Sequence, residues 1–330
     1  ADMTLPTTMI AITMSEPGGP EVLKSTITNL PARNENEVLI KVTSAGVNGP
    51  DLVQRRGLYP APKGASSLLG LEVSGEVIEV DDEKNSFKIG EHVCALTNGG
   101  GYAEYVVANK KHCLRIPKGV SKIDAAGLPE TYFTVWSNLF FKQSFKPGDN
   151  ILIHGGSGGI GSTAIQIGNA LGLNVFATAD SDSACDYCID LGAKQAINFK
   201  NEDFVKILRA VGGADIILDI IGGDYISRNI KASRHDARII QLAFNQGSKV
   251  NIDLMPIMLK RLHLTGSTLR SRPDAYKAEI AADLLNKIWP LFEKNQIKPT
   301  TYKTFELSDV VNAHQLMESG THRGKILLKI

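Results

Sequence analysis

The sequence lacks the features that mark membrane, disulfide-rich and nucleic-acid-binding proteins. No apolar run reaches the roughly 20 residues that a membrane-spanning helix needs. Four cysteines in 330 residues are too few for a disulfide framework, so we expect a protein of the reducing cytoplasm. The net charge is +1, and its acidic and basic residues are interspersed rather than gathered in a basic patch. These absences favour an ordinary globular protein, whose length predicts about two domains.

Metal-ligand spacings are absent as well. The histidines show no H-x-x-x-H or H-x-x-E spacing. Cys185 and Cys188 form a C-x-x-C pair in an expected helix, but no second pair completes a tetrahedral zinc site. Two buried thiols are the simpler interpretation of this pair. We therefore predict no metal site.

The chain divides into parts with two different patterns of expected secondary structure. Residues 1–128 contain strand-like runs separated by turns, such as the alternating segments Glu37–Thr43 and Glu72–Val80. Residues 129–294 alternate apolar strand-like runs with helix-length segments, which is the pattern of a parallel sheet covered on both faces. Residues 295–330 return to short strands, and we expect them to rejoin the first domain. The expected strands of the second domain are Asn150–His154, Asn174–Ala179, Gln195–Asn198, Ile216–Ile220, Ala237–Leu242 and Leu262–Ser267.

A glycine-rich segment, Ile151–Ser162 (ILIHGGSGGIGS), lies between an expected strand and an expected helix. Gly156, Gly158 and Gly161 satisfy G-x-G-x-x-G, in which the glycines serve the turn, the approach of a pyrophosphate and close helix packing. Asp180 follows at the end of the next strand, where an acid that binds ribose is expected. The segment therefore predicts a dinucleotide site. A flexible glycine loop does not explain the flanking pattern.

A polar cluster in the first domain comprises Asn48, Asp51, Arg55 and Tyr59. Asparagine, aspartate, glycine and proline are the residues that turns and helix caps use, so a purely structural role stays open. The spacing nevertheless carries a resemblance. Asn48, Asp51, Arg55, Gly57, Tyr59 and Pro60 fit N-x-x-D-x-x-x-R-x-G-x-Y-P, a signature of the zeta-crystallin-like quinone oxidoreductases.

The resemblance to this zinc-free branch of the medium-chain dehydrogenase/reductase superfamily extends along the chain. Further matching segments are Leu69–Gly75, Pro129–Trp136, His154–Gly161, Thr265–Arg270 and His322–Leu327. It implies an α/β fold with a GroES-like β-rich catalytic domain and a Rossmann domain with a doubly wound parallel sheet. It also implies a quinone and a cofactor in the cleft between the domains, and a homodimer or homotetramer. Zinc-dependent relatives place a cysteine at the position of Asn48 and a histidine at that of Leu71.

The resemblance also assigns site residues. Asn48, Asp51 and Tyr59 would form the catalytic set, with Tyr59 lining the quinone pocket as a proton donor or hydrogen-bond partner. Asn48 and Thr134 would lie near the nicotinamide, and Leu242, Ala243 and Phe244 would close over its ring. The remaining residues implied to bind cofactor are Gly156, Gly158, Gly159, Ile160 and Gly161 at the pyrophosphate, with Asp180, Ser181, Phe199, Arg270 and Lys325.

The identity of the dinucleotide is less clear from the residues. Many family members read A-G-S-x-x-K after the second Rossmann strand and N-Y downstream, which suits a 2′-phosphate. Here Asp180 replaces the glycine, Ala184 the lysine and Phe199 the tyrosine. An acid repels a phosphate and suits a ribose diol, which favours NADH. Lys200 or Arg270 could compensate, and the family favours NADPH, which we place first.

The function implied is NAD(P)H-dependent reduction of a quinone without a metal. An enone or 2-alkenal reductase of the same superfamily is the alternative enzyme, with Tyr59 as a possible proton donor to carbon. The non-enzymatic alternative is a cofactor-binding protein with a structural or RNA-binding role, although the balanced charge of the sequence provides no basic patch for RNA. We expect a small-molecule partner and no membrane partner.

Overall fold

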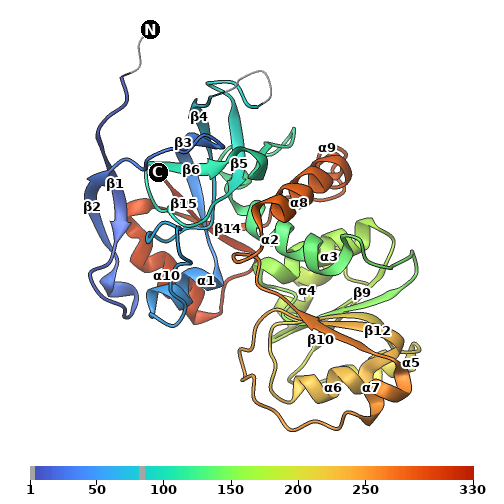
Figure 1. The fold of residues 1–330 in the computed structure, drawn as a ribbon. Helices are drawn as coiled ribbons and strands as arrows, with labels where there is room; N and C mark the ends of the chain where they lie inside the picture. Colours follow the sequence, from blue (N-terminus) through green and yellow to red (C-terminus); the bar gives the residue numbers. More distant parts are fainter. Residues whose placement is uncertain (1–3, 82–85) are drawn as a thin grey trace. The chain divides into compact units, whose positions relative to one another are not determined.

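The structure is a computed structural model that describes residues 4–81 and 86–330. The chain forms two compact units (Figure 1). Unit 1 comprises Ala1–Phe133 and Arg270–Ile330, and unit 2 comprises Thr134–Leu269. The limits predicted from the sequence were 1–128 with 295–330, and 129–294. Residues 270–294 belong with unit 1, where Trp289 packs its ring edge-on against Tyr132.

Unit 1 is built on antiparallel strands. In its described residues, one sheet has seven strands in the order β14-β15-β3-β4-β5-β7, and β6 also pairs with β3. A second sheet is the antiparallel pair β1-β2. The strands are β1 (Thr8–Thr13), β2 (Lys24–Asn29), β3 (Glu37–Val47), β4 (Glu72–Glu79), β5 (His92–Leu96), β6 (Tyr105–Asn109), β7 (Cys113–Arg115), β14 (Thr301–Glu306) and β15 (Lys325–Lys329).

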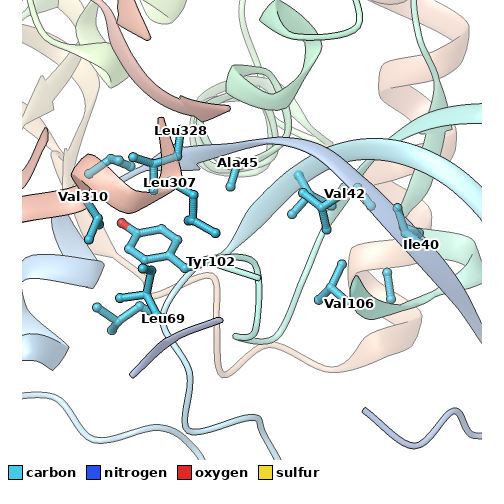
Figure 2. Close-up of a cluster of buried hydrophobic side chains, with 14 of the residues drawn as sticks. Ile40, Val42, Ala45, Leu69, Tyr102, Val106, Leu307, Val310 and Leu328 are labelled. Atoms are coloured by element: carbon cyan, nitrogen blue, oxygen red, sulfur yellow. The ribbon is translucent and has the colours of Figure 1, made fainter. Parts of the chain in front are cut away.

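Helices and 3-10 turns complete unit 1. Its α-helices are α1 (Gly49–Arg55), α8 (Asp274–Lys287), α9 (Trp289–Glu293) and α10 (Val310–Ser319), and α2 (Pro129–Val135) begins in it. Single 3-10 turns are η1 (Pro20–Val22), η2 (Lys110–His112), η3 (Asp124–Gly127) and η5 (Leu307–Asp309). The alternating apolar residues of β3 face a core that also receives the carboxyl-terminal elements (Figure 2). That core includes Ile40, Val42, Ala45, Leu69, Tyr102, Val106, Leu307, Val310 and Leu328.

The last strand has a central place in unit 1. β15 pairs antiparallel with β3, where Ile326 faces Val47, and parallel with β14. Its apolar residues Ile326, Leu327 and Leu328 are fully buried. A strand near the end of the chain thus lies beside a strand from its beginning, and together they support the site described below.

Unit 2 contains the predicted parallel sheet. The order is β10-β9-β8-β11-β12-β13, and all neighbouring pairs run parallel. Figure 1 shows α3 and α4 on one face of this sheet and α5, α6 and α7 on the other. The strands are β8 (Asn150–Ile153), β9 (Asn174–Ala179), β10 (Gln195–Asn198), β11 (Ala214–Asp219), β12 (Ser233–Gln241) and β13 (His263–Gly266). The helices are a π-helical turn, η4 (Trp136–Phe140), α3 (Gly159–Ala170), α4 (Asp182–Asp190), α5 (Phe204–Ala210), α6 (Tyr225–Ala232) and α7 (Met255–Lys260).

The strand order reverses direction between β8 and β11. Strands β8, β9 and β10 extend to one side, and β11, β12 and β13 extend to the other. In open parallel sheets of this kind, ligands bind outside the carboxyl ends of the strands at the point of reversal. The glycine-rich segment follows β8 directly, so it lies at this point.

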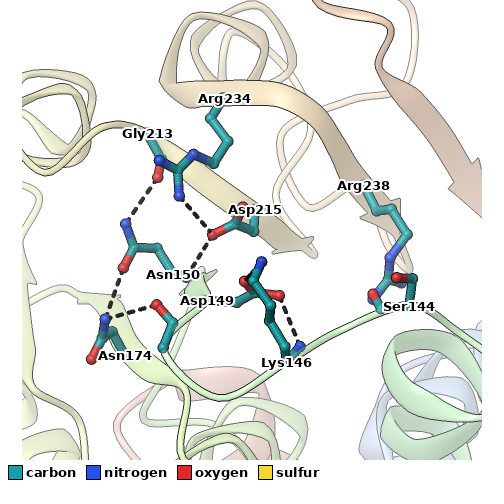
Figure 3. A network of polar contacts seen from close by, with 10 residues as sticks. Ser144, Lys146, Asp149, Asn150, Asn174, Gly213, Asp215, Arg234 and Arg238 are labelled. Carbon is teal, nitrogen blue, oxygen red and sulfur yellow. Dashed lines mark hydrogen bonds and ion pairs between the residues drawn. The ribbon is translucent and has the colours of Figure 1, made fainter.

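A polar network holds the opposite end of the sheet (Figure 3). Asn150, at the start of β8, donates from Nδ2 to the carbonyl oxygens of Gly213 (3.0 Å) and Val211 (3.3 Å). Its Oδ1 accepts from Asn174 Nδ2 at 3.1 Å, and its backbone N–H donates to Asp215 at 2.8 Å. This one side chain therefore joins three segments that enter neighbouring strands.

We predict that Asn150→Ala lowers the free energy of unfolding by about 1–3 kcal/mol, because the Gly213 carbonyl loses its Asn150 donor and the Asn174 amide loses one of its two acceptors. Urea unfolding of the full chain measures this loss. Asn174→Ala is the matched control, and we expect a smaller loss since Asn174 is partly exposed. Equal losses for the two variants would contradict the central role of Asn150.

Candidate active site

Three polar side chains meet in the interior of unit 1. Lys325 Nζ, from β15, lies 2.8 Å from Glu72 Oε2 and 2.5 Å from Asn48 Oδ1. Asn48 Nδ2 donates to the same Glu72 oxygen at 2.9 Å. The Glu72 side chain is completely buried and that of Lys325 is 5% exposed. We call these residues the Asn48–Glu72–Lys325 triad.

Local sequence explains how the triad fits. Glu72 opens β4, and the facing strand β3 carries Gly46. A Cβ atom at Gly46 would lie 1.8 Å from Glu72 Oε2, so only glycine leaves room for this carboxylate. A buried ion pair is tolerated when the remaining polar groups are bonded, and Glu72 Oε1 accepts from the backbone N–H of Glu130 at 2.9 Å. Both oxygens of Glu72 are therefore occupied.

Asp51 fixes the loop that carries Asn48. Its carboxylate accepts from the backbone N–H groups of Asn48 (2.9 Å) and Gly70 (3.1 Å) and from the Tyr102 hydroxyl (3.1 Å). Asn48 immediately precedes α1, and Asp51 is the third helical residue, which is the arrangement of a helix cap. Burial raises the pKa of Asp51 from 3.8 to about 6, although its hydrogen bonds oppose this shift. Because protein groups occupy it, we interpret Asp51 as a positioning residue.

A directed chain of hydrogen bonds continues from Asp51 to the protein surface. Arg55 Nη1 lies 2.8 Å from His314 Nδ1, and His314 Nε2 lies 3.0 Å from the Tyr102 hydroxyl. Arginine only donates, so Nδ1 accepts and the neutral ring carries its proton on Nε2. Tyr102 therefore accepts from His314 and donates to Asp51. Burial, together with the charge of Arg55, lowers the pKa of His314 to about 3, which keeps the ring neutral.

The far end of this series of hydrogen bonds reaches α10. The buried Arg55 forms an ion pair with Glu318, whose side chain is partly exposed and also pairs with Arg56 at 2.9 Å. The α10 helix thereby holds α1 and the Asn48 loop in place. The structural interpretation of the Asn48 cluster as turn and cap residues thus describes Asp51 and Arg55, whereas the Asn48 side chain belongs to the triad.

Tyr59 and Arg270 lie in the same unit as the triad. Tyr59 follows α1 and is 41% exposed. Arg270 donates to Gln54 Oε1 (2.6 Å) and Asn98 Oδ1 (3.3 Å), while its Nη2 is buried with no partner among the described residues. A cavity of about 470 Å³ in unit 1 is lined by Asn98 and Lys277, among others, and its lining does not include Asn48 or Tyr59.

In unit 2, the glycine-rich turn follows β8 as predicted. The positive φ of this turn (66°) belongs to Gly155, one position before the G-x-G-x-x-G motif. A Cβ atom at Gly156 would lie 2.8 Å from Ala177 and 2.9 Å from the Cys188 sulfur, so this glycine serves packing rather than the turn. At Gly161 a Cβ atom would lie 2.2 Å from the Gly155 oxygen.

Gly158 differs from its neighbours. A Cβ atom there would meet only the Gly155 oxygen, at an ordinary 3.6 Å, and its φ is −78°. Neither protein packing nor backbone conformation requires a glycine at this position. Gly158 caps α3, whose first N–H groups, those of Gly159 and Ile160, have no partner within the helix. A bare backbone beside free N–H groups fits a pyrophosphate.

Acidic side chains follow the second strand of unit 2. Asp180 is exposed, and Ser181 caps α4 by accepting from the Ala184 N–H. Burial raises the pKa of the Cys185 thiol, and the carboxylates of Glu202, Asp182, Asp186 and Asp180 raise it further, which shows that these acids share one region. Ala184 is 2% exposed, so packing explains its small side chain. Phe199 is 38% exposed, and Lys200 is exposed as well.

The other residues assigned to the nicotinamide lie in unit 2 by chain position. Leu242, Ala243 and Phe244 follow β12, and Leu242 N–H donates to the Asp219 carbonyl at 2.9 Å, at the carboxyl end of β11. Phe244 is 46% exposed. The Thr134 carbonyl accepts from Ser137 and Asn138 in the turn that follows α2. Their roles in cofactor binding stay predictions.

Among residues 4–81 and 86–330, no group of three or more His, Cys, Asp and Glu side chains is arranged to hold a metal ion. Cys185 and Cys188 are buried cysteines, as predicted. In the same described part of the chain, no helix is long and apolar enough to cross a membrane.

Sequence reasoning missed several members of the site. Glu72, Tyr102, His314 and Glu130 were not proposed as site residues, and Lys325 was assigned to the cofactor rather than to Asn48 and Glu72. A signal existed for two of them. Lys325 opens the apolar strand KILLK, and Glu72 lies between the apolar residues Leu71 and Val73; buried charges are rare unless they are paired.

Comparisons with known proteins agree with both units. Residues 34–118 match the family model described as "Alcohol dehydrogenase GroES-like domain", and residues 159–286 match "Zinc-binding dehydrogenase". The quinone oxidoreductase of Mus musculus is 31% identical over 330 residues, 97% of each chain, and that of Homo sapiens is 31% identical over 97% of each chain. The chain belongs to the quinone oxidoreductase family.

Solved structures support the same assignment. The Escherichia coli quinone oxidoreductase, complexed with NADPH, is 26% identical with a TM-score of 0.84, covering 98% of this chain and 100% of that one. The quinone oxidoreductase from Coxiella burnetii is 30% identical with a TM-score of 0.80, covering 98% and 99%. The predicted fold class, a GroES-like domain and a Rossmann domain, is confirmed, as is the assignment to an oxidoreductase enzyme family.

We predict opposite effects for two glycine substitutions in the turn after β8. Gly158→Ala should retain wild-type stability, because its Cβ has room, and should weaken dinucleotide binding by tenfold or more, since it obstructs the pyrophosphate. Gly161→Ala should instead destabilise the turn, because its Cβ meets a backbone oxygen. Urea unfolding and quenching of intrinsic fluorescence by the dinucleotide measure the two effects. Unchanged binding by Gly158→Ala would contradict this assignment.

Proposed function

We propose that this chain is an NAD(P)H-dependent quinone oxidoreductase that works without zinc. Its relatives named quinone oxidoreductase align over 97% of the chain, and the triad gives the physical support for metal-free chemistry. The main structural support for the proposal is the position of the Lys325 ammonium group. It lies between Asn48 Oδ1 and Glu72 Oε2, beside the loop that contains Asn48.

The donor set at Asn48 does not fit a zinc ion. Zinc-dependent members of the wider superfamily have a cysteine and a histidine where this chain has Asn48 and Leu71, and a carboxamide and a leucine do not replace these ligands. A second cation beside Lys325 would also be repelled, because the ammonium already occupies the two oxygens that could bind it. No step of the proposed reaction uses a metal.

The residues of unit 1 would bind and orient the acceptor. One N–H of the Asn48 carboxamide is bonded to Glu72, and the second N–H has no partner among the described residues and is available to a ligand. Asp51 holds the Asn48 loop through its three hydrogen bonds, and Tyr59 would contact an oxygen of the quinone. An activated acceptor needs positioning and exclusion of water more than a Lewis acid.

The residues of unit 2 would hold the dinucleotide. The N–H groups of Gly159 and Ile160 would bind the pyrophosphate at the bare backbone of Gly158. Thr134 and Leu242–Phe244 would adjoin the nicotinamide. When bound, the reduced nicotinamide supplies the electrons for reduction. The remaining residues assigned to the cofactor are Gly156, Gly161, Asp180, Ser181, Phe199, Arg270 and Lys325.

NADPH is the dinucleotide that we propose first, as in the related Escherichia coli enzyme complexed with it. One observation favours NADH. The acids around Cys185, including Asp180 and Asp182, make the region after β9 negative, and a 2′-phosphate would be repelled there.

Two other functions are distinguished by assay. An enone or 2-alkenal reductase would use the same site on a conjugated C=C bond, and an RNA-binding protein would show a salt-dependent gel shift with AU-rich RNA. We further propose a cytoplasmic homodimer or homotetramer that acts on a small molecule and has no membrane or nucleic-acid partner.

We predict that the purified chain oxidises NADPH or NADH when a simple benzoquinone is added, and faster than it does with an α,β-unsaturated ketone. Loss of the reduced-nicotinamide absorbance measures both rates. Activity should survive dialysis against a metal chelator, because no step requires a metal. A quinone rate equal to the enzyme-free control contradicts the proposed function, and a chelator-sensitive rate contradicts its zinc independence.

We predict that Asp180→Asn improves the affinity for NADPH relative to NADH by roughly fivefold, since it removes one negative charge near the 2′ position. Binding is measured by fluorescence quenching with each dinucleotide. Asp190→Asn is the matched control, because Asp190 ends α4 about 12 Å along the helix from its start. An equal change in the two variants would mean that Asp180 does not face the 2′ position.

A further inference from the structure

His154 is a buried histidine that follows β8 and directly precedes the glycine-rich turn of unit 2. His154, Thr178 on β9, Asn229 on α6 and Asp219 on β11 are each at most 1% exposed. His154 Nδ1 lies 3.0 Å from Thr178 Oγ1, and its Nε2 lies 2.7 Å from Asn229 Oδ1. Asn229 Nδ2 donates to Asp219 Oδ2 at 2.9 Å. We call these four residues the His154 network, and they join three neighbouring strands of the sheet.

Asp219 fixes the direction of the bonds in the His154 network. Its carboxylate only accepts, so Asn229 donates to it from Nδ2 and offers Oδ1 to His154. His154 therefore carries its proton on Nε2, and its Nδ1 accepts from the Thr178 hydroxyl. Burial lowers the pKa of His154 below its ordinary value of 6.5, and Arg228 adds to this effect, whereas Asp219 and Asn229 oppose it without reversing it. The ring is consequently neutral at pH 7.

One end of the His154 network reaches the turn assigned to the pyrophosphate. The Thr178 hydroxyl oxygen accepts from the Gly155 N–H at 3.3 Å, and the Thr178 carbonyl accepts from the Gly156 N–H at 2.9 Å. The Gly155 carbonyl in turn accepts from the Gly158 N–H at 3.2 Å. A displacement of Gly155 would therefore move the bare backbone of Gly158.

The other end holds the turn after β11. Asp219 Oδ1 accepts from the backbone N–H groups of Ile221 (2.6 Å) and Gly222 (3.3 Å). The Ile221 carbonyl accepts from the Gln246 N–H at 2.7 Å, which joins this turn to the segment after β12. A Cβ atom at Gly222 would lie 2.8 Å from the Phe244 ring, so the turn packs against a residue assigned to the nicotinamide.

We propose that His154 is a positioning residue for the dinucleotide, because it couples the pyrophosphate turn to the segment assigned to the nicotinamide. This inference rests on the dinucleotide site of the proposed function. His154 is too deeply buried to contact a ligand itself. A neutral imidazole suits the role, since it accepts on one side and donates on the other, whereas lysine and arginine only donate. Such coupling is reciprocal, so a change at either end alters binding at the other.

The first test measures binding of ADP, which has a pyrophosphate but no nicotinamide. Asn229→Leu keeps the approximate size of the side chain and breaks the His154 network on the side away from the pyrophosphate. We expect it to weaken ADP binding about fivefold or more in a calorimetric titration. Asn150→Ala is the matched control, because it removes buried hydrogen bonds at the opposite end of the same sheet, and it should bind ADP as the wild type does. Unchanged affinity in Asn229→Leu, or an equal loss in both variants, overturns the proposal.

A second pair of variants serves if Asn229→Leu does not fold. Thr178→Val keeps the shape of the side chain but removes the hydroxyl that joins His154 to the pyrophosphate turn, whereas Thr178→Ser retains it. We expect Thr178→Val to weaken ADP binding and to shift the amide resonances of Gly222 and Phe244, and Thr178→Ser to restore both. Weaker ADP binding with unmoved Gly222 and Phe244 resonances would make the effect local, which contradicts the coupling.

The tautomer of His154 is a readout that needs neither ligand nor turnover. In ¹⁵N-labelled protein, the ring should carry its proton on Nε2 throughout the range from about pH 6 to pH 9, and a proton on Nδ1 overturns the direction of the bonds. Quinone reduction is assayed separately. A wild type that binds ADP but reduces no quinone contradicts the proposed function and leaves the role of His154 standing, whereas a wild type that binds no ADP contradicts both.

Discussion

The buried ion pair between Lys325 and Glu72 is the interaction on which the rest of unit 1 depends. Two opposite charges removed from water are tolerated when hydrogen bonds to neighbouring groups replace those to water, and the surrounding residues supply several. Gly46 gives the carboxylate room, the Glu130 N–H occupies its second oxygen, and Asn48 bonds to both charged groups. The carboxamide of Asn48 is consequently fixed in orientation before any ligand binds.

A second set of bonds reaches the same loop from the other direction. Asp51, Tyr102, His314 and Arg55 form a chain in which each donor and acceptor is determined by its neighbour, since arginine can only donate. The Asn48 loop is thus held by β15 on one side and by α10 on the other. Such a doubly held loop is suited to chemistry that depends on positioning rather than on a metal.

Much of the fold could be predicted from the sequence, whereas the internal bonds of the site could not. The parallel sheet and the turn at Gly158 follow from periodicity and a spaced motif, and both are local signals. The partnership of Glu72 with Lys325 joins residues far apart in the chain, and no spacing rule reports it. The role of Gly156 was assigned to the turn because the motif allows that, but the contact with Cys188 depends on how α4 packs.

The position of Lys325 constrains the order in which the enzyme can be assembled during synthesis. Lys325 and Asn48 are 277 positions apart, and all of Thr134–Leu269 is made between them. Because domains fold as units while the chain emerges, unit 2 is free to complete its sheet early. The Glu72 carboxylate must remain hydrated or protonated until Lys325 has been synthesised. Unit 2 can thus become able to bind the dinucleotide while unit 1, which contains Asn48, still lacks β15.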